Sequence, residues 1–209
     1  MFTIDEAIKK AKDASKTKFD ATVELHINLL QDKKKTETNI RFTTVLPHGT
    51  GKTKKVAVLA SKKIANADLE LTEADIEKIE KGEIRPRTDF EVLIAEPRYM
   101  PKLAKVAKIL GPAGMMPNPK IGTVTENVEE AVNQMKKGKI EIRTEKDHPV
   151  IHTLLGKVSF QDIALKENFY EIYNTLKQNK PAKAKQDWIK SVYLSTSMGP
   201  SIQINLASL

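Results

Sequence analysis

Hydrophobic positions in the first 50 residues change from a helical to an alternating pattern. Residues 4–11 are apolar at every third or fourth position, and Thr3 and Glu6 have the spacing of a capping box, so we expect a helix that ends near Lys16. Residues 19–30 alternate strictly between apolar and polar, which predicts a half-buried strand. A second, antiparallel strand is expected over 38–46. The inward side chains of the first strand are Val23, Leu25, Ile27 and Leu29.

Short apolar runs and amphipathic stretches alternate in the middle of the chain. Two runs of four or five apolar residues are each followed by a stretch with helical spacing, and a third such stretch precedes the expected strand 139–143. This order predicts parallel strands covered by helices. The first strand lacks the glycine fingerprint of a dinucleotide site. The expected strands are 56–60, 91–95 and 139–143, and the expected helices are 72–81, 101–110 and one capped by Thr125 and ended by Gly138.

The last 60 residues resemble the first 50 in their pattern, with alternating strands and one amphipathic helix. A strand over 151–155 is expected to precede a helix over 162–179, and residues 190–205 form two alternating strands broken by a turn at Gly199-Pro200. The polar side of these last strands carries hydroxyls and amides rather than charges, although an ordinary half-buried hairpin has the same pattern. The apolar stripe of the helix is Ile163, Phe169, Ile172, Tyr173 and Leu176.

The shared pattern of the two ends and the different pattern of the middle predict an α+β discontinuous domain with an inserted three-layer α/β (Rossmann-like) domain. Residues 1–53 and 150–209 form the discontinuous domain, and 54–149 form the insertion. Two chain crossings, near Thr53 and Pro149, would allow a hinge between them.

Charge favours an anionic partner, and nucleic acid is the first candidate. The 209 residues have a net charge of +8 and a pI of about 9.4. Residues 1–53 and 150–209 together contribute +6, and 54–149 only +2. Cysteine is absent, which excludes disulfides and cysteine-ligated metals. We find no apolar run of membrane-spanning length and no secretory signal, so we expect a cytoplasmic protein without a membrane partner.

One short motif imitates a nucleotide site. Gly51-Lys52-Thr53 resembles the end of a phosphate-binding loop, but Leu46 stands where that motif needs a glycine. An apolar strand follows instead of a helix, so no helix N-terminus would face a phosphate. We therefore interpret this segment as an interdomain crossing.

The loop from Leu110 to Val124, LGPAGMMPNPKIGTV, is too particular for a generic connection. It resembles the signature of the first-numbered large-subunit ribosomal protein family (L-one), at the base of the mobile side stalk. FDATVE from Phe19, LPHG from Leu46 and TSMGPS from Thr196 match the same family in the same order, so the resemblance covers nearly the whole chain. Ala113 replaces a basic residue usual in the family, and the N-terminus is shorter than in many bacterial members.

The resemblance implies a non-enzymatic, two-domain protein that binds large-subunit ribosomal RNA and helps to release exit-site tRNA. It also implies repression of its own mRNA, cytoplasmic ribosomes as the location, and a monomer off the ribosome. The family's RNA contacts carry over to matching positions, where hydroxyls suit the 2′-hydroxyls of RNA and lysines supply long-range attraction. These positions are Lys18, Phe19, Thr22, Glu24, Ser191, Ser197, Met198 and Gly199, with Lys157, Ser159 and the Lys33–Lys35 run as further candidates.

Other interpretations remain open from the sequence. Phe19 has the alternative of core packing, the lysine run that of a solvated turn, and the 111–124 loop that of a structural role rather than an RNA contact. The four histidines are interpreted as structural or surface residues, and no catalytic set, metal site or cofactor is expected. Competing functions are a small α/β enzyme for a phosphorylated ligand and a translational repressor that acts off the ribosome.

Overall fold

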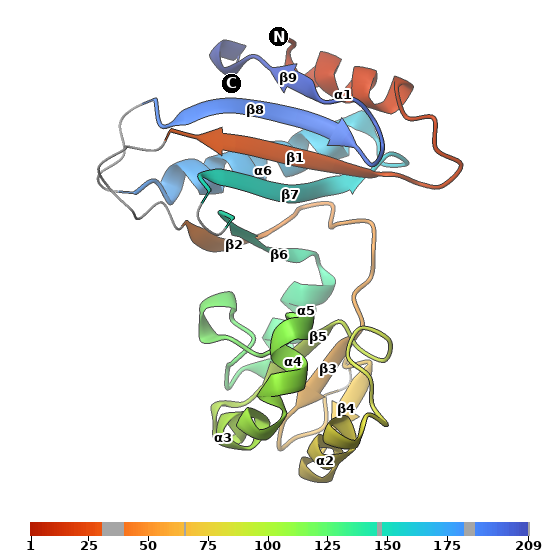
Figure 1. Cartoon of the computed structure of the whole chain (residues 1–209), viewed down its shortest axis with the longest axis vertical. Coiled ribbons are helices and arrows are strands. Elements are labelled where there is room, and N and C mark those ends of the chain that lie inside the picture. Colours follow the sequence, from red (N-terminus) through yellow and green to blue (C-terminus); the bar gives the residue numbers. More distant parts are fainter. Residues whose placement is uncertain (31–39, 65, 146–147, 182–186, 209) are drawn as a thin grey trace. The chain divides into compact units, whose positions relative to one another are not determined.

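The computed structural model describes residues 1–30, 40–64, 66–145, 148–181 and 187–208. The chain divides into two compact units, residues 1–52 with 138–209 and residues 53–137 (Figure 1). The lysine run 33–35 and most of the expected linker 180–185 lie outside the described residues. The first unit contains α1 (Ile4–Asp13), β1 (Thr22–Leu29), β2 (Arg41–Val45), β6 (Lys139–Arg143), β7 (Val150–Lys157), α6 (Asp162–Gln178), β8 (Ile189–Thr196), β9 (Ile202–Ile204) and the 3-10 turn η4 (Leu206–Ser208).

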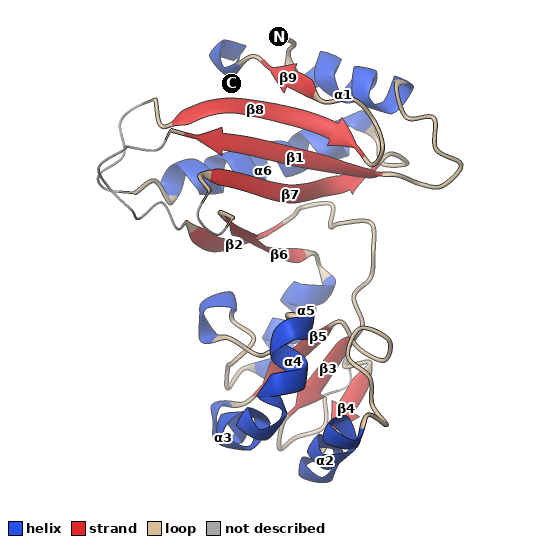
Figure 2. Ribbon diagram, viewed as in Figure 1, coloured by secondary structure: helices blue, strands red, loops and turns tan. Residues whose placement is uncertain are grey.

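The first unit is built on an antiparallel sheet of four strands in the order β7-β1-β8-β9. The predicted alternation of β1 is confirmed, because its four apolar side chains are buried and its four polar ones are partly exposed. The apolar side chains pack in one core with residues of α1 and α6, so both helices cover the same face (Figure 2). The opposite face carries the polar side chains.

The predicted capping box of α1 is present. The Thr3 hydroxyl accepts from the Glu6 amide at 3.4 Å, and the Glu6 carboxylate accepts from the Thr3 amide at 3.0 Å. Helix α6 forms as expected, with one exception. Ile163 was assigned to its apolar stripe but is 67% exposed, because it lies two positions before buried Leu165, about 200° around the helix from the face that packs in the core.

A second sheet in this unit completes one prediction and corrects another. Strand β2, expected as a second, antiparallel strand, pairs antiparallel with β6, while β1 pairs with β7 and β8. Residues 139–143 were expected in the inserted α/β domain, but as β6 they belong to the first unit. Periodicity identifies the buried face of a strand and says nothing of its partner, so the sequence did not reveal that β2 and β6 pair.

Asn168 ties α6 to the rest of its unit. Its side chain is fully buried, and its amide donates to the carbonyls of Leu155 at 2.8 Å and Gly49 at 3.1 Å. Its carbonyl accepts from the His48 amide at 3.1 Å. A buried amide with three partners is stabilising, whereas loss of this side chain would leave backbone groups unpaired.

The second unit is a parallel sheet in the order β4-β3-β5 with helices on both faces. All four residues of β3 are buried, because α2 and the segment after β5 pack on one side and α5 packs on the other. Strand β4 was not predicted from the sequence. The elements are β3 (Val56–Leu59), β4 (Leu69–Leu71), α2 (Glu73–Lys81), β5 (Val92–Ala95), η1 (Pro97–Tyr99), α3 (Met100–Leu103), η2 (Ala104–Val106), α4 (Ala107–Ala113), η3 (Pro119–Ile121) and α5 (Val128–Lys136).

The helices of this unit follow the sequence with two differences. Helix α2 ends at Gly82, as predicted, in the left-handed conformation. The single helix expected over 101–110 is interrupted by the 3-10 turn η2, and the helix expected to be capped by Thr125 begins after Asn127. Among the described residues, none of the helices combines the length and apolar character that a membrane crossing requires.

Candidate nucleic-acid interface

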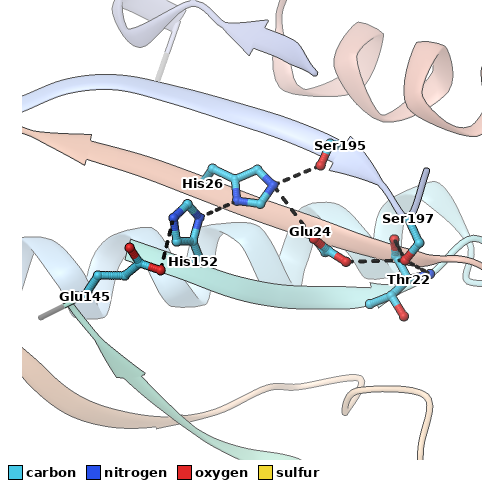
Figure 3. Close-up of polar contacts among 7 residues, drawn as sticks. All are labelled: Thr22, Glu24, His26, Glu145, His152, Ser195 and Ser197. Carbon is cyan, nitrogen blue, oxygen red and sulfur yellow. Dashed lines mark hydrogen bonds and ion pairs between the residues drawn. The ribbon is translucent and has the colours of Figure 1, made fainter. Parts of the chain in front are cut away.

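The N-terminal end of β1 and the turn after β8 form one hydrogen-bonded cluster (Figure 3). The Ser197 amide donates to the Thr22 carbonyl at 2.9 Å, and the Thr22 amide donates to the Ser197 hydroxyl oxygen at 3.3 Å. That hydroxyl also lies 3.3 Å from a carboxylate oxygen of Glu24. Three predicted site residues from opposite ends of the sequence therefore meet on the polar face.

Lys157 and Ser159 extend this cluster across β7. The Lys157 ammonium donates to the Thr22 hydroxyl at 2.9 Å and to the Asp20 carbonyl at 3.3 Å. Ser159 donates to the Asp20 carboxylate through its hydroxyl at 2.8 Å and its amide at 3.1 Å. These contacts hold the segment before β1 against β7, with a cation beside the hydroxyls.

Two large apolar side chains next to this cluster face solvent. Phe19 is 60% exposed and Met198 is 92% exposed, so Phe19 does not pack in the core. Met198 also has φ of 65°, a left-handed conformation that is uncommon for any residue other than glycine. An exposed methionine in a strained turn gains nothing within the described fold, and such outliers cluster at binding sites.

Gly199 has a steric reason to be glycine. A Cβ at this position would lie 2.1 Å from the Thr196 hydroxyl oxygen, and the Gly199 amide donates to the Thr196 carbonyl at 2.7 Å. The close approach shapes the turn that exposes Met198. Lys18 is exposed just before Phe19.

Ser191 does not join the cluster. It lies opposite Asn28, and its hydroxyl accepts from the side-chain amide of Asn28 at 2.9 Å. Asn28 follows Thr22 by six residues, which is about 20 Å along a strand. Ser191 is on the same polar face but near the other end of β1, so the predicted site residues mark both ends of one surface.

A histidine pair lies between these two ends, and the sequence interpretation missed it (Figure 3). The Nδ1 atoms of His26 and His152 are 2.7 Å apart, and His26 Nε2 is 2.9 Å from the Ser195 hydroxyl oxygen. Burial, and then the neighbouring His152, lower the pKa of His26, while Glu24 acts in the opposite direction. Strand alternation showed that His26 faces outward, but only the register of β1 and β7 brings the two rings together.

The charge of the first unit agrees with an anionic partner. Its residues 1–52 and 138–209 contain 20 basic and 14 acidic side chains, against 15 and 13 in residues 53–137. Reassigning β6 to this unit leaves its net charge at +6. Within the described part of the chain, no group of three or more histidine, cysteine or acidic residues is arranged to hold a metal ion.

The second unit offers a different kind of surface. A pocket of about 470 Å³ opens at the carboxyl ends of β3 and β5, beside the first turn of α5. Its lining includes Lys62 and Lys63 but also four carboxylates, so it is poorly suited to a phosphorylated ligand. The carboxylates are Glu96, Glu126, Glu129 and Glu130.

The segment after Gly51-Lys52-Thr53 is strand β3, as predicted, so these residues do not face a helix N-terminus. The 111–124 loop lies against β5. Thr123 is buried, its carbonyl accepts from the Ala95 amide at 3.0 Å, and its hydroxyl bonds to the backbone of Asn118. These contacts give the loop a structural role within the second unit.

Comparison with known proteins identifies the family. Residues 8–200 match the model described as the Ribosomal protein L1p/L10e family. The chain belongs to this family. It is 47% identical to the large ribosomal subunit protein uL1 of Mesoplasma florum over 99% of this chain and 91% of the relative. The proteins of that name from Phytoplasma australiense (47%; 98% and 90%) and Synechococcus sp. (43%; 98% and 87%) are also similar.

Family membership confirms the resemblance inferred from the four motifs. It also agrees with the prediction that the chain is not an enzyme, since the family is one of ribosomal proteins.

Proposed function

We propose that this protein is a structural constituent of the large ribosomal subunit in the cytoplasm and binds large-subunit ribosomal RNA through the polar face of its four-stranded sheet. The observation that carries this proposal is the Thr22–Glu24–Ser197 cluster, flanked in the chain by exposed Phe19 and Met198. Hydroxyls and a carboxylate can exchange hydrogen bonds with 2′-hydroxyls and base edges, and apolar side chains can pack on sugars or bases.

In this proposal the discontinuous α+β unit binds the RNA, and the α/β unit is inserted in its sequence. The first unit's net charge of +6 supplies the electrostatic attraction, and Lys157 and Lys18 lie at or near the cluster. Lys18, Ser159, Ser191 and Gly199 are the remaining proposed contact or supporting residues. Assistance to exit-site tRNA release, binding of its own mRNA and a monomeric state off the ribosome follow from the resemblance and belong to the proposal.

Binding to a side-stalk fragment of large-subunit RNA, compared with an unrelated hairpin at two salt concentrations, tests the proposal. Selective binding that persists at the higher salt supports recognition of a structured RNA, whereas weak, unselective binding that disappears with salt reflects charge alone. Presence of the protein in purified large subunits separates a ribosomal constituent from a repressor that acts only off the ribosome.

The joint replacement Ser197→Ala and Met198→Gly should weaken RNA binding by about 1–3 kcal/mol, because hydrogen bonds and an apolar contact are lost. The turn should keep its shape, since glycine favours the left-handed conformation that Met198 adopts. Ile163→Ala is the matched control, because this exposed apolar side chain lies on α6, which covers the other face. Equal affinities for the double variant and the control would reject the site.

A further inference from the structure

The two ends of the proposed RNA surface have the histidine pair between them. His26 lies two residues from Glu24 and two from Asn28 on the polar face of β1, directly opposite His152 on β7. The proposed RNA surface runs along the polar face from Ser197 toward buried Ser191, so an RNA that covers it passes over this part of the sheet. The side chain of His152 is 47% exposed, so it is accessible from that face.

The hydrogen bond between the rings limits how many protons the pair can hold. One Nδ1 must donate and the other must accept, so the neutral pair has one Nε2 atom without a hydrogen. A single proton can bind there without breaking the contact between the rings. A second proton would place hydrogens on both Nδ1 atoms, 2.7 Å apart, and would separate the rings.

The surroundings of the pair can accept one positive charge. Glu24 Oε2 is 3.9 Å from His26 Nε2, and Glu145 Oε1 is 3.8 Å from His152 Nε2. On β8, Tyr193 lies opposite His26, and the Ser195 hydroxyl contacts its Nε2. Among the residues that the structure describes, the nearest charged groups are thus carboxylates, and they favour the cationic form against the burial that lowers the pKa of His26.

We propose that the His26–His152 pair contacts the phosphate backbone of bound RNA as a monocation, so that RNA binding takes up about one proton. This inference rests on the proposed RNA-binding function and adds a pH-dependent contact to it. Phosphates near the pair stabilise its charged form, as the carboxylates do. RNA affinity therefore rises as the pH falls through the titration of the pair.

The test is the affinity of the full-length protein for the side-stalk RNA fragment between pH 5.5 and 8.5, at one fixed ionic strength. Uptake of one proton strengthens binding by at most about tenfold per pH unit below the pKa of the complex. We expect a rise of several fold from pH 8 to pH 6 for the native protein. In the variant His26→Gln with His152→Gln, this rise should disappear.

His48→Gln is the matched control, because this histidine is half-exposed in the same unit but contacts Glu167 of α6, on the helical side of the sheet. It should keep the native pH dependence. NMR titration of the native protein's own histidines provides a measurement that needs no variant: RNA should raise the pKa of the pair and leave His48 unchanged.

A double glutamine variant that keeps the native pH dependence would overturn the inference, as would histidine pKa values that RNA leaves unchanged. Either result, with selective RNA binding intact, rejects the role of the pair alone. If the native protein does not bind the RNA selectively at any pH, the proposed function itself fails.

Discussion

At the scale of single residues, the turn after β8 exposes Met198 because the next residue, Gly199, has no side chain. Gly199 lies so close to the Thr196 hydroxyl that only a hydrogen fits on its Cα atom. Among the described residues, that hydroxyl is the one buried side-chain polar atom without a hydrogen-bond partner. The strained Met198 and the tight Gly199 together present the apolar tip of the proposed interface.

Gly199→Ala should destabilise the first unit by about 1–3 kcal/mol and weaken RNA binding, because the new methyl group overlaps the Thr196 hydroxyl. Urea unfolding and RNA affinity measure the two effects. Adding Thr196→Ala should restore part of the loss by removing that oxygen. A double variant no better than Gly199→Ala would contradict this explanation.

The control for this prediction is Gly111→Ala in α4. This position has open space for a methyl group and no left-handed φ. Alanine in a helix is favoured over glycine by about 0.5–1 kcal/mol, so this variant should be neutral or more stable.

At the scale of elements, the start of α2 shows a cap made by a carboxylate. Asp75 accepts from the Thr72 amide at 2.8 Å and from the Thr72 hydroxyl at 2.7 Å, and it lies 2.8 Å from the Lys78 ammonium. The pKa of Asp75 is lowered to about 2, chiefly by the hydrogen bond from Lys78 and then by the hydrogen bonds from Thr72. The charged carboxylate is therefore the form that stabilises the folded helix.

Asp75→Asn should destabilise α2 by about 0.5–1 kcal/mol at pH 7, since an N-terminal cap and a surface ion pair are weakened. The folded pKa is below the unfolded value near 3.8, so this stabilisation is present above about pH 4 and is lost as the pH falls toward 2. Hydrogen exchange of the α2 amides measures the difference. Glu80→Gln, an exposed carboxylate late in the same helix, should show no such loss.

At the scale of the whole molecule, the first unit is held together by contacts between the segment that precedes the second unit in the sequence and the segment that follows it. Strand β6 completes the β2 sheet, and the Leu46 amide donates to the Gly138 carbonyl at 3.3 Å. A Cβ on Gly138 would lie 2.5 Å from the Gly49 Cα, so the backbones are in direct contact there. The ends left by removal of the second unit are thus close in space.

A chain that lacks residues 53–137, with Lys52 joined to Gly138 by two or three glycines, should fold and keep most of the RNA binding. Lys52 is three positions after Gly49, and an extended chain spans that separation within about 11 Å, so a short linker suffices. Circular dichroism, urea unfolding and RNA affinity test this. A folded product that no longer binds RNA would place the main contact in the second unit.

The comparison variant lacks residues 55–148, which is close to the inserted domain 54–149 that the sequence alone suggests. It removes β6 and leaves β2, with buried Phe42, without its paired strand. We expect this variant to be less stable and more prone to aggregate than the first.

The sequence alone determined most of the elements and most of their buried faces, because periodicity, caps and turn residues act within a few positions. The alternation of β1, the capping box of α1, Gly82 after α2 and the Gly199 turn were all predictable in this way. The family motifs added the site positions, which local patterns could not supply. Ile163 was wrongly assigned to the stripe of α6, since a 3.6-residue period places it about 200° around the helix from buried Leu165.

Only the tertiary structure decided which strands pair and which polar side chains meet. Thr22 and Ser197 are 175 positions apart, and His26 and His152 are 126 apart. Local propensity carries no information on such contacts, because register and pairing depend on how all the apolar faces are buried together. For the same reason the sequence assigned β6 to the wrong unit, and a histidine pair on facing strands appeared as separate surface residues.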